Sequence, residues 1–145
     1  NIFGPRMGYD HVIPELINRF LKLKKNENNL LLENPNHKRA FCYIDDAINQ
    51  ILLLYKSKKA SFKIINVGSF EEKKILELAK GILKKMKKNN IKIEKKNIKN
   101  RSPLRRLPDL TKNILLTKLI KRTDFYESLN KTIDWYKKNY EQKKN

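Results

Sequence analysis

Arg39-Ala40-Phe41-Cys42-Tyr43-Ile44-Asp45-Asp46 is the stretch that decides the fold, because it changes from a strand pattern to the start of a helix. Side chains alternate over residues 39–44, which predicts a strand with Phe41 and Tyr43 on the same face as Arg39. Asp45 or Asp46 then offers a side-chain cap for a helix. The run 51–55 predicts one or two buried helical turns. The apolar positions of this helix are Ala47, Ile48, Ile51, Leu52 and Tyr55.

Upstream of this stretch, the sequence predicts a strand end, a helix and a second strand. Ile2-Phe3 is typical of the end of a buried strand that leads into a Gly-Pro turn. Asp10 is the expected cap of a helix over about residues 11–24, and residues 29–33 form a short strand followed by a turn at 34–37. The apolar stripe of the helix is Val12, Ile13, Leu16, Ile17 and Phe20.

Downstream, helices and strands continue to alternate. Residues 62–67 predict a buried strand that ends at Gly68, and Ser69 is the expected cap of a helix over about 71–87. The sequence then predicts a strand at 91–94, a loop at 97–108 and a short helix from Asp109 or Thr111 to Leu116. Thr123 or Asp124 caps the last helix, whose stripe is Phe125, Leu129, Ile133 and Tyr136. The predicted class is α/β, with helices and a few short strands.

Composition narrows the class of protein. The 145 residues suffice for one domain or part of a larger one, and no apolar run reaches the roughly 20 residues that cross a bilayer. The net charge of +19 allows non-specific binding of nucleic acid, but the lysines are dispersed and aromatic residues are not interleaved with them. Cys42, in a predicted strand, is expected to be a small buried residue, and a lone cysteine fits the cytoplasm. His11 and His37 are not spaced as ligands of one metal, so no metal site is predicted.

Arginine is used sparingly in this lysine-rich chain, so its positions stand out. A planar guanidinium binds a phosphate through two parallel hydrogen bonds, which an ammonium cannot do. Arg39 begins the strand described above, and Arg106 lies in Arg105-Arg106-Leu107-Pro108-Asp109, where Pro108 makes the corner rigid. We predict that Arg39 and Arg106 bind phosphate while Arg105 faces solvent. A structural arginine–carboxylate pair is the alternative interpretation.

Four ordered segments carry a resemblance to a known family. They are Asn1-Ile2-Phe3-Gly4-Pro5-Arg6-Met7, Arg39 to Asp46, Asn66-Val67-Gly68 with the helix pattern at 75–79, and Arg105 to Asp109. The pattern at 129–136 resembles a closing helix. Together they resemble the C-terminal half of the extended short-chain dehydrogenases/reductases, which are NAD-dependent nucleotide-sugar epimerases, dehydratases and decarboxylases.

This resemblance implies that residues 1–145 form the substrate-binding portion of a Rossmann-type enzyme. Arg39 and Arg106 would clamp the diphosphate of a nucleotide-sugar from two sides, and Asn66 would bind its nucleotide or sugar end. Asn1 would contact the sugar or the diphosphate, while His11 and Val12 would line the nucleotide pocket. The identity of the base, the sugar and the reaction outcome stays open. The implied substrate-binding residues are Asn1, His11, Val12, Arg39, Asn66 and Arg106.

The resemblance also implies NAD as cofactor and an NAD-binding half as partner. The sequence contains neither the family's glycine-rich loop nor its Tyr-x-x-x-Lys pair in a fitting context, because Tyr136-Lys137 and Tyr140 fall in the terminal helix. We therefore expect no catalytic residue in this chain, which would be inactive without an N-terminal NAD-binding half. A homodimer is possible. The alternatives are a basic nucleic-acid-binding module and a decayed, non-catalytic fragment.

Overall fold

The computed structural model describes residues 1–24, 26–99, 102–119 and 122–142. Its helices are α1 (Val12–Lys22), α2 (Ile44–Lys56), the 3-10 turn η1 (Lys58–Ala60), α3 (Ile75–Lys85), α4 (Thr111–Thr117) and α5 (Phe125–Gln142). Its strands are β1 (Ile2–Phe3), β2 (Asn29–Glu33), β3 (Lys38–Ala40), β4 (Cys42–Tyr43), β5 (Glu72–Lys74), β6 (Lys92–Lys96) and β7 (Arg105–Arg106). This mixture of helices and short strands confirms the predicted α/β class.

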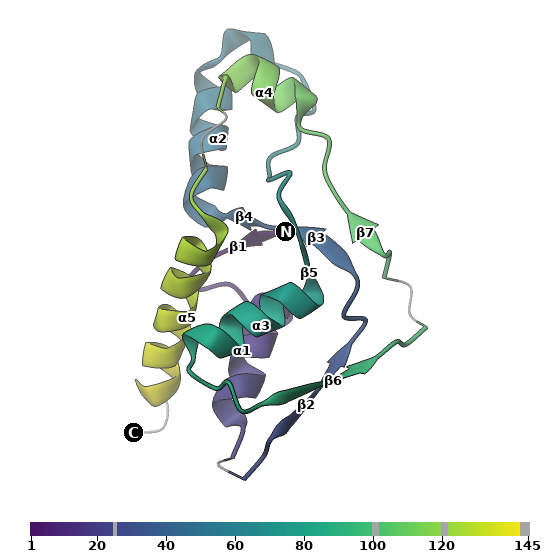
Figure 1. The fold of residues 1–145 in the computed structure, drawn as a ribbon. Helices are drawn as coiled ribbons and strands as arrows, with labels where there is room; N and C mark the ends of the chain where they lie inside the picture. Colours follow the sequence, from purple (N-terminus) through teal and green to yellow (C-terminus); the bar gives the residue numbers. More distant parts are fainter. Residues whose placement is uncertain (25, 100–101, 120–121, 143–145) are drawn as a thin grey trace.

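The strands form three small sheets instead of one large one. β1 pairs in parallel with β4, and β2 pairs in parallel with β6. The third sheet has the order β5-β3-β7, in which β3 and β7 are parallel and β3 and β5 antiparallel. Figure 1 shows this third sheet beside the N-terminus, while α2 and α5 follow one another along the opposite side of the molecule.

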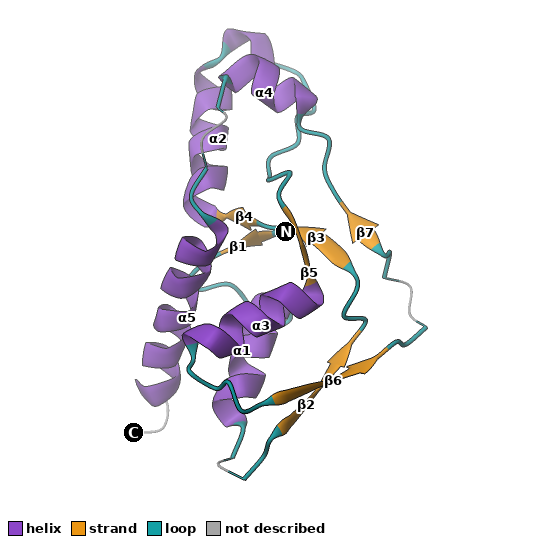
Figure 2. Cartoon of the chain, in the orientation of Figure 1, coloured by secondary structure: helices purple, strands orange, loops and turns teal. Residues whose placement is uncertain are grey.

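The core lies where α1, α3 and α5 pack on one another and on the short strands (Figure 2). The stripes predicted for α1 and α5 are buried, apart from the half-buried Val12, because each follows the 3.6-residue period of a helix. Burying one large apolar side chain stabilises the fold by about 1.5–3 kcal/mol. The central side chains are Ile13, Leu16, Ile17, Phe20, Leu78, Ala79, Ile82, Leu129 and Ile133.

The strand predicted over residues 39–44 is divided in two, so that prediction was wrong in its length. β3 pairs with β5 and β7, whereas β4 pairs with β1, and the chain passes from one sheet to the other at Phe41. Ile44 already belongs to α2. β7 likewise occupies part of the predicted loop at 97–108, of which residues 100–101 lie outside the described residues.

Most predicted helix caps were wrong. α1 begins after His11 rather than Asp10, and α2 begins after Tyr43, in both cases without a side-chain cap. The Asp46 carboxylate instead accepts hydrogen bonds from the Thr123 backbone (3.1 Å) and hydroxyl (3.0 Å), which tie α2 to the start of α5. Residues 72–74 form β5, so α3 starts at Ile75 and not after a Ser69 cap. The predicted start of α4 at Thr111 is confirmed, although this helix has no side-chain cap, and the predicted cap Asp124 is confirmed by its bond to the Glu127 backbone.

The apolar residues of α2 are largely exposed, contrary to the predicted buried turns. Ile51 is 51% and Leu52 49% exposed, although Ala47 on the same helix is 1% exposed. Residues 62–67 form no strand in the described chain: Phe62 lies in a turn with a φ of 58°, and Phe62 and Ile64 are almost fully exposed. A strand needs a neighbour for its backbone groups, so an apolar sequence alone was insufficient to form one here.

Candidate functional site

A cavity of about 380 Å³ opens between α1 and the β3–β7 edge. It contains five of the six predicted substrate-binding residues: Asn1, His11, Val12, Arg39 and Arg106. Sequence reasoning missed several further lining residues. They are Asp10, Glu15, Leu16, Arg19, Leu32, Glu33, Asn34, His37, Ile75 and Ser102.

The pairing of β3 with β7 brings the two predicted arginines together. Arg39 and Arg106 are direct partners in this parallel register, although 66 positions separate them in the sequence. Partners in register project to the same face of a sheet, so both side chains reach one cavity. Burial lowers the pKa of Arg39, and repulsion from Arg106 lowers it further, so the two positive charges interact.

Arg39 is the anchored member of the pair. The residue is only 8% exposed, and its guanidinium donates to the Lys38 carbonyl at 2.7 Å and to Ser102 Oγ at 2.7 Å. Its Nη2 also lies 3.4 Å from His37 Nδ1. These contacts hold the guanidinium in one orientation at the back of the cavity.

Arg106 is the available member of the pair. Within the described residues, its exposed guanidinium makes no hydrogen bond and no ion pair. Its neighbour Arg105 is already paired, because its Nε and Nη2 donate hydrogen bonds to the Glu72 carboxylate at 2.8 and 2.7 Å. This hydrogen bond lowers the pKa of Glu72 and raises that of Arg105. Arg105 is exposed, as expected, with 60% of its side chain accessible, but it also forms a bidentate pair that leaves Arg106 as the free fork.

The carboxylates of the cavity do not neutralise Arg106. Glu15 pairs with Arg19 at 3.3 Å on α1, and Arg19 also donates to the Leu31 carbonyl at 2.5 Å. Asn1 and Arg106 line the same cavity, so one bound ligand can contact both residues.

Asn66 does not line this cavity. Its side chain donates to the Asp109 carbonyl at 3.0 Å, and its own carbonyl accepts a hydrogen bond from Asn113 at 2.8 Å. The neighbouring buried amide of Gln50 donates to the Gly68 carbonyl at 2.9 Å and accepts from the Gly68 backbone N–H at 3.1 Å. Sequence reasoning missed Gln50, because a lone glutamine in an apolar helix pattern carries no signal of its own.

This buried amide cluster supports the corner that carries Arg106. Asn113 also donates to Gln50 at 3.0 Å, so α2, α4 and the turn at Gly68 share one set of hydrogen bonds. A Cβ added to Gly68 would lie 3.3 Å from Pro108 Cγ, which shows how closely the turn packs on that corner. The corner is therefore fixed from behind by packing as well as by the proline ring.

The remaining expectations concern cysteine, metals and membranes. Cys42 is buried as expected, and burial raises the pKa of its thiol, which suits a packing role. In the described ranges, no three His, Cys, Asp or Glu side chains are grouped so as to hold a metal ion. None of the described helices combines the length and the apolar character that a bilayer crossing requires.

Comparison with known proteins gives consistent similarities. Residues 1–68 match the model of the NAD dependent epimerase/dehydratase family. The chain is 27% identical to human dTDP-D-glucose 4,6-dehydratase over 100% of this chain and 42% of that protein. It is 29% identical to UDP-glucuronic acid decarboxylase 1 of Xenopus tropicalis over 100% of this chain and 34% of that protein. The chain thus spans less than half the length of these curated relatives.

Solved structures show the same fold. A UDP-glucuronic acid 4-epimerase of Bacillus cereus, in complex with UDP-glucuronic acid and NAD, matches with a TM-score of 0.79 and 23% identity. The match covers 97% of this chain and 44% of that chain. An epimerase of Methanothermobacter thermautotrophicus matches with a TM-score of 0.82 and 22% identity, over 98% of this chain and 42% of that chain. At these identities the likeness concerns the fold.

Proposed function

Because this chain resembles the C-terminal half of the NAD-dependent epimerases/dehydratases, we propose that it binds a nucleotide-sugar as the substrate-binding portion of such an enzyme. The observation that carries the proposal is the pair Arg39 and Arg106, which are register partners in one cavity. Arg39 is held in place from behind, and Arg106 is free to bind.

The pair suits a diphosphate better than a single carboxylate. A diphosphate carries about two negative charges at neutral pH, and a charge-assisted hydrogen bond contributes about 1.5–3 kcal/mol. Arg106 supplies a free fork, while Arg39 supplies a fixed charge and its remaining donors. The same anion would relieve the repulsion that lowers the pKa of Arg39.

The other contacts follow from the walls of the cavity. Asn1, His11 and Val12 line it beside the arginines, so we assign them to the sugar and the nucleoside. We leave Asn66 out of the proposed contacts, because its side chain is bonded to Asp109 and lies apart from the cavity. We place this activity in the cytoplasm, where a free thiol such as Cys42 persists.

The glycines of this chain do not form a phosphate cradle for NAD. A Cβ added to Gly4 would lie 2.5 Å from Ile44 Cγ2, and one added to Gly81 would lie 3.1 Å from Tyr126. Gly68 packs on Pro108, and Gly8 faces open space. We propose that NAD, which several of the similar solved structures contain, is held by an NAD-binding portion outside these residues.

The exposed apolar face supports such a partner. Ile51 on α2 lines a groove of about 470 Å³ together with Lys63 and Ile65. The exposed apolar side chains of these two segments include Ile51, Leu52, Phe62 and Ile64. Large exposed apolar patches mark interaction surfaces. We propose that this face packs against the NAD-binding portion.

The test compares two adjacent arginines that differ only in their partners. Binding of UDP-, dTDP-, GDP- and CDP-sugars is measured by calorimetry and thermal shift, beside an RNA control. Arg106→Gln should weaken the best ligand by about 10- to 150-fold, which corresponds to one lost charge-assisted interaction. The matched control Arg105→Gln removes the same charge but should change affinity less than about threefold, because Arg105 is bound to Glu72.

Two results would overturn the proposal. One is equal loss of affinity in both variants, which would indicate a general charge effect. The other is a melting temperature that responds to RNA alone.

A further inference from the structure

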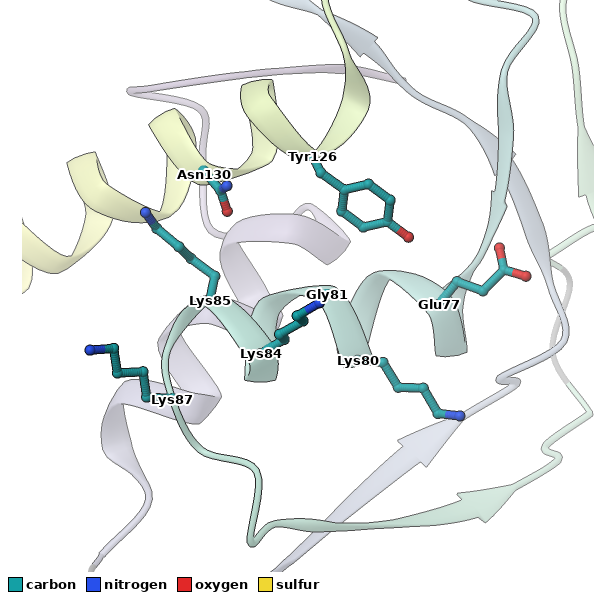
Figure 3. A pocket seen from close by; sticks show the side chains of 8 residues that line it. All are labelled: Glu77, Lys80, Gly81, Lys84, Lys85, Lys87, Tyr126 and Asn130. Carbon is teal, nitrogen blue, oxygen red and sulfur yellow. The ribbon is translucent and has the colours of Figure 1, made fainter.

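A second cavity, of about 680 Å³, lies between α3 and α5, away from the arginine pair (Figure 3). Its volume falls within the range of about 300–1,000 Å³ that small-molecule sites occupy. Figure 3 shows Tyr126 of α5 projecting towards α3, from which Lys80, Lys84 and Lys85 extend in different directions. The lining residues are Glu77, Lys80, Gly81, Lys84, Lys85, Lys87, Tyr126 and Asn130.

Gly81 shapes the floor of this cavity. A glycine inside a helix costs about 1 kcal/mol relative to alanine, so its place in the middle of α3 needs a reason. A Cβ at this position would lie 3.1 Å from the Tyr126 ring and 3.5 Å from Leu129. The missing side chain lets the ring lie against the helix while 46% of the residue remains exposed.

The lysines around the ring carry uncompensated charge. Lys85 pairs with Asp134 at 3.1 Å, but Lys80, Lys84 and Lys87 make no ion pair within the described parts of the chain. Lys80 and Lys84, four residues apart, lie on one side of α3, and Lys87 follows the C-terminal end of that helix. The single carboxylate of the lining, Glu77, accepts a hydrogen bond from the Lys74 backbone at 3.0 Å.

An exposed aromatic ring beside a row of free cations is the combination that binds a nucleotide unit. The base can stack on the ring, while the ammonium groups contact the phosphates. The Asn130 amide, also in the lining, offers both a donor and an acceptor to a base edge. The sequence hides this arrangement, because the tyrosine belongs to α5 and the lysines belong to α3.

We propose that the α3–α5 cavity is a second site, separate from the arginine pair, which binds a nucleobase and its phosphate. Tyr126 stacks on the base, and Lys80, Lys84 and Lys87 hold the phosphate. The unit comes either from a free nucleotide or from a single-stranded nucleic acid, and the arms of the experiment distinguish these sources.

The experiment must separate this site from the overall charge of +19, which binds polyanions anywhere on the surface. Fluorescence anisotropy follows a labelled oligouridylate of about ten nucleotides, with UMP and inorganic polyphosphate as competitors. Tyr126→Leu should weaken binding by about 5- to 150-fold, and Tyr126→Phe should retain it, because a phenyl ring also stacks. Circular dichroism and melting curves check that each variant folds.

The charge arm compares two triple variants of equal charge. Lys80→Gln/Lys84→Gln/Lys87→Gln should reduce the slope of log affinity against log salt by about two, at about 0.7 per lost phosphate contact. The control changes three exposed lysines outside the cavity and should leave the contribution of Tyr126 intact. The control residues are Lys58, Lys59 and Lys63.

The results distinguish a free nucleotide from a single-stranded nucleic acid as the ligand, and they can also contradict the proposal. Displacement of the oligonucleotide by UMP supports a site for free nucleotides, and its persistence against excess UMP supports a site for a strand. Arg106→Gln should leave either binding unchanged. The proposal is wrong if Tyr126→Leu binds like the unmodified chain, or if both triple variants lose the same affinity and salt dependence.

Discussion

Replacing Gln50 with alanine should destabilise this protein far more than an ordinary substitution on α2. The residue is 2% exposed, and its amide bonds to the Gly68 carbonyl, the Gly68 N–H and Asn113, with a weaker fourth hydrogen bond to Cys42 Sγ at 3.8 Å. Each neutral bond contributes about 1 kcal/mol, and the truncation leaves buried partners unpaired. The expected loss is therefore about 3 kcal/mol of the free energy of unfolding.

Urea unfolding measures this loss. For a slope of about 1–3 kcal/mol per molar urea, the midpoint should fall by about 1–3 M while the slope stays unchanged. The neighbouring Asn49 provides the control, because it carries an amide on the same helix but is exposed. Asn49→Ala should change the stability by less than about 0.5 kcal/mol.

A loss below about 1 kcal/mol for Gln50→Ala would contradict the reasoning. It would mean that water replaces the amide and that this cluster does not fix the turn at Gly68. The same result would remove the support that we assign to the corner behind Arg106.

Three further predictions test other parts of the fold. The hydrogen bond from Arg105 lowers the pKa of Glu72 in the folded protein. The pair therefore stabilises the protein above the pKa that Glu72 has in the unfolded chain, and this stabilisation is lost as the pH falls through the lowered pKa of the folded state. The urea midpoint of Glu72→Gln should therefore drop less on acidification than that of the unmodified chain. Burial raises the pKa of Tyr136 to about 12, so stability should fall between about pH 10 and 12 as the unfolded chain ionises first, and Tyr136→Phe, which also loses the bond to the Met7 carbonyl, should abolish this decline. Phe20→Ala should cost about 3–5 kcal/mol in calorimetry or urea unfolding, and a cost below about 1 kcal/mol would place Phe20 outside the close-packed core.

The helical core could be predicted because its signal is local. Ile13, Leu16 and Ile17 recur at helical spacing and are buried on α1, and Leu129 and Ile133 do the same on α5. The same reasoning failed for α2, where Ile51 and Leu52 are exposed. The spacing of apolar residues indicates which face of a helix favours burial, but it does not indicate whether another part of the described chain covers that face.

Helix caps were harder to predict because a short polar side chain has several possible partners. Asp46 lies in the first turn of α2, yet it bonds to Thr123, 77 positions later. Asp124 does cap α5 through the Glu127 backbone. Both carboxylates satisfy buried or terminal N–H groups, and only tertiary packing decides which ones lie within reach.

The sequence by itself determined the amphipathic helices of the core and the α/β class, because residue type and spacing carry that information. It also singled out Arg39 and Arg106 as predicted phosphate ligands. Only the tertiary structure decided that β3 and β7 pair in register, that Arg105 is bound to Glu72 while Arg106 stays free, and that Tyr126 lines one cavity with lysines of α3. Contacts between distant segments depend on which backbone groups find partners when the chain is compact. Hydrogen bonding and packing across the whole fold determine these contacts, and no single stretch of sequence contains that information.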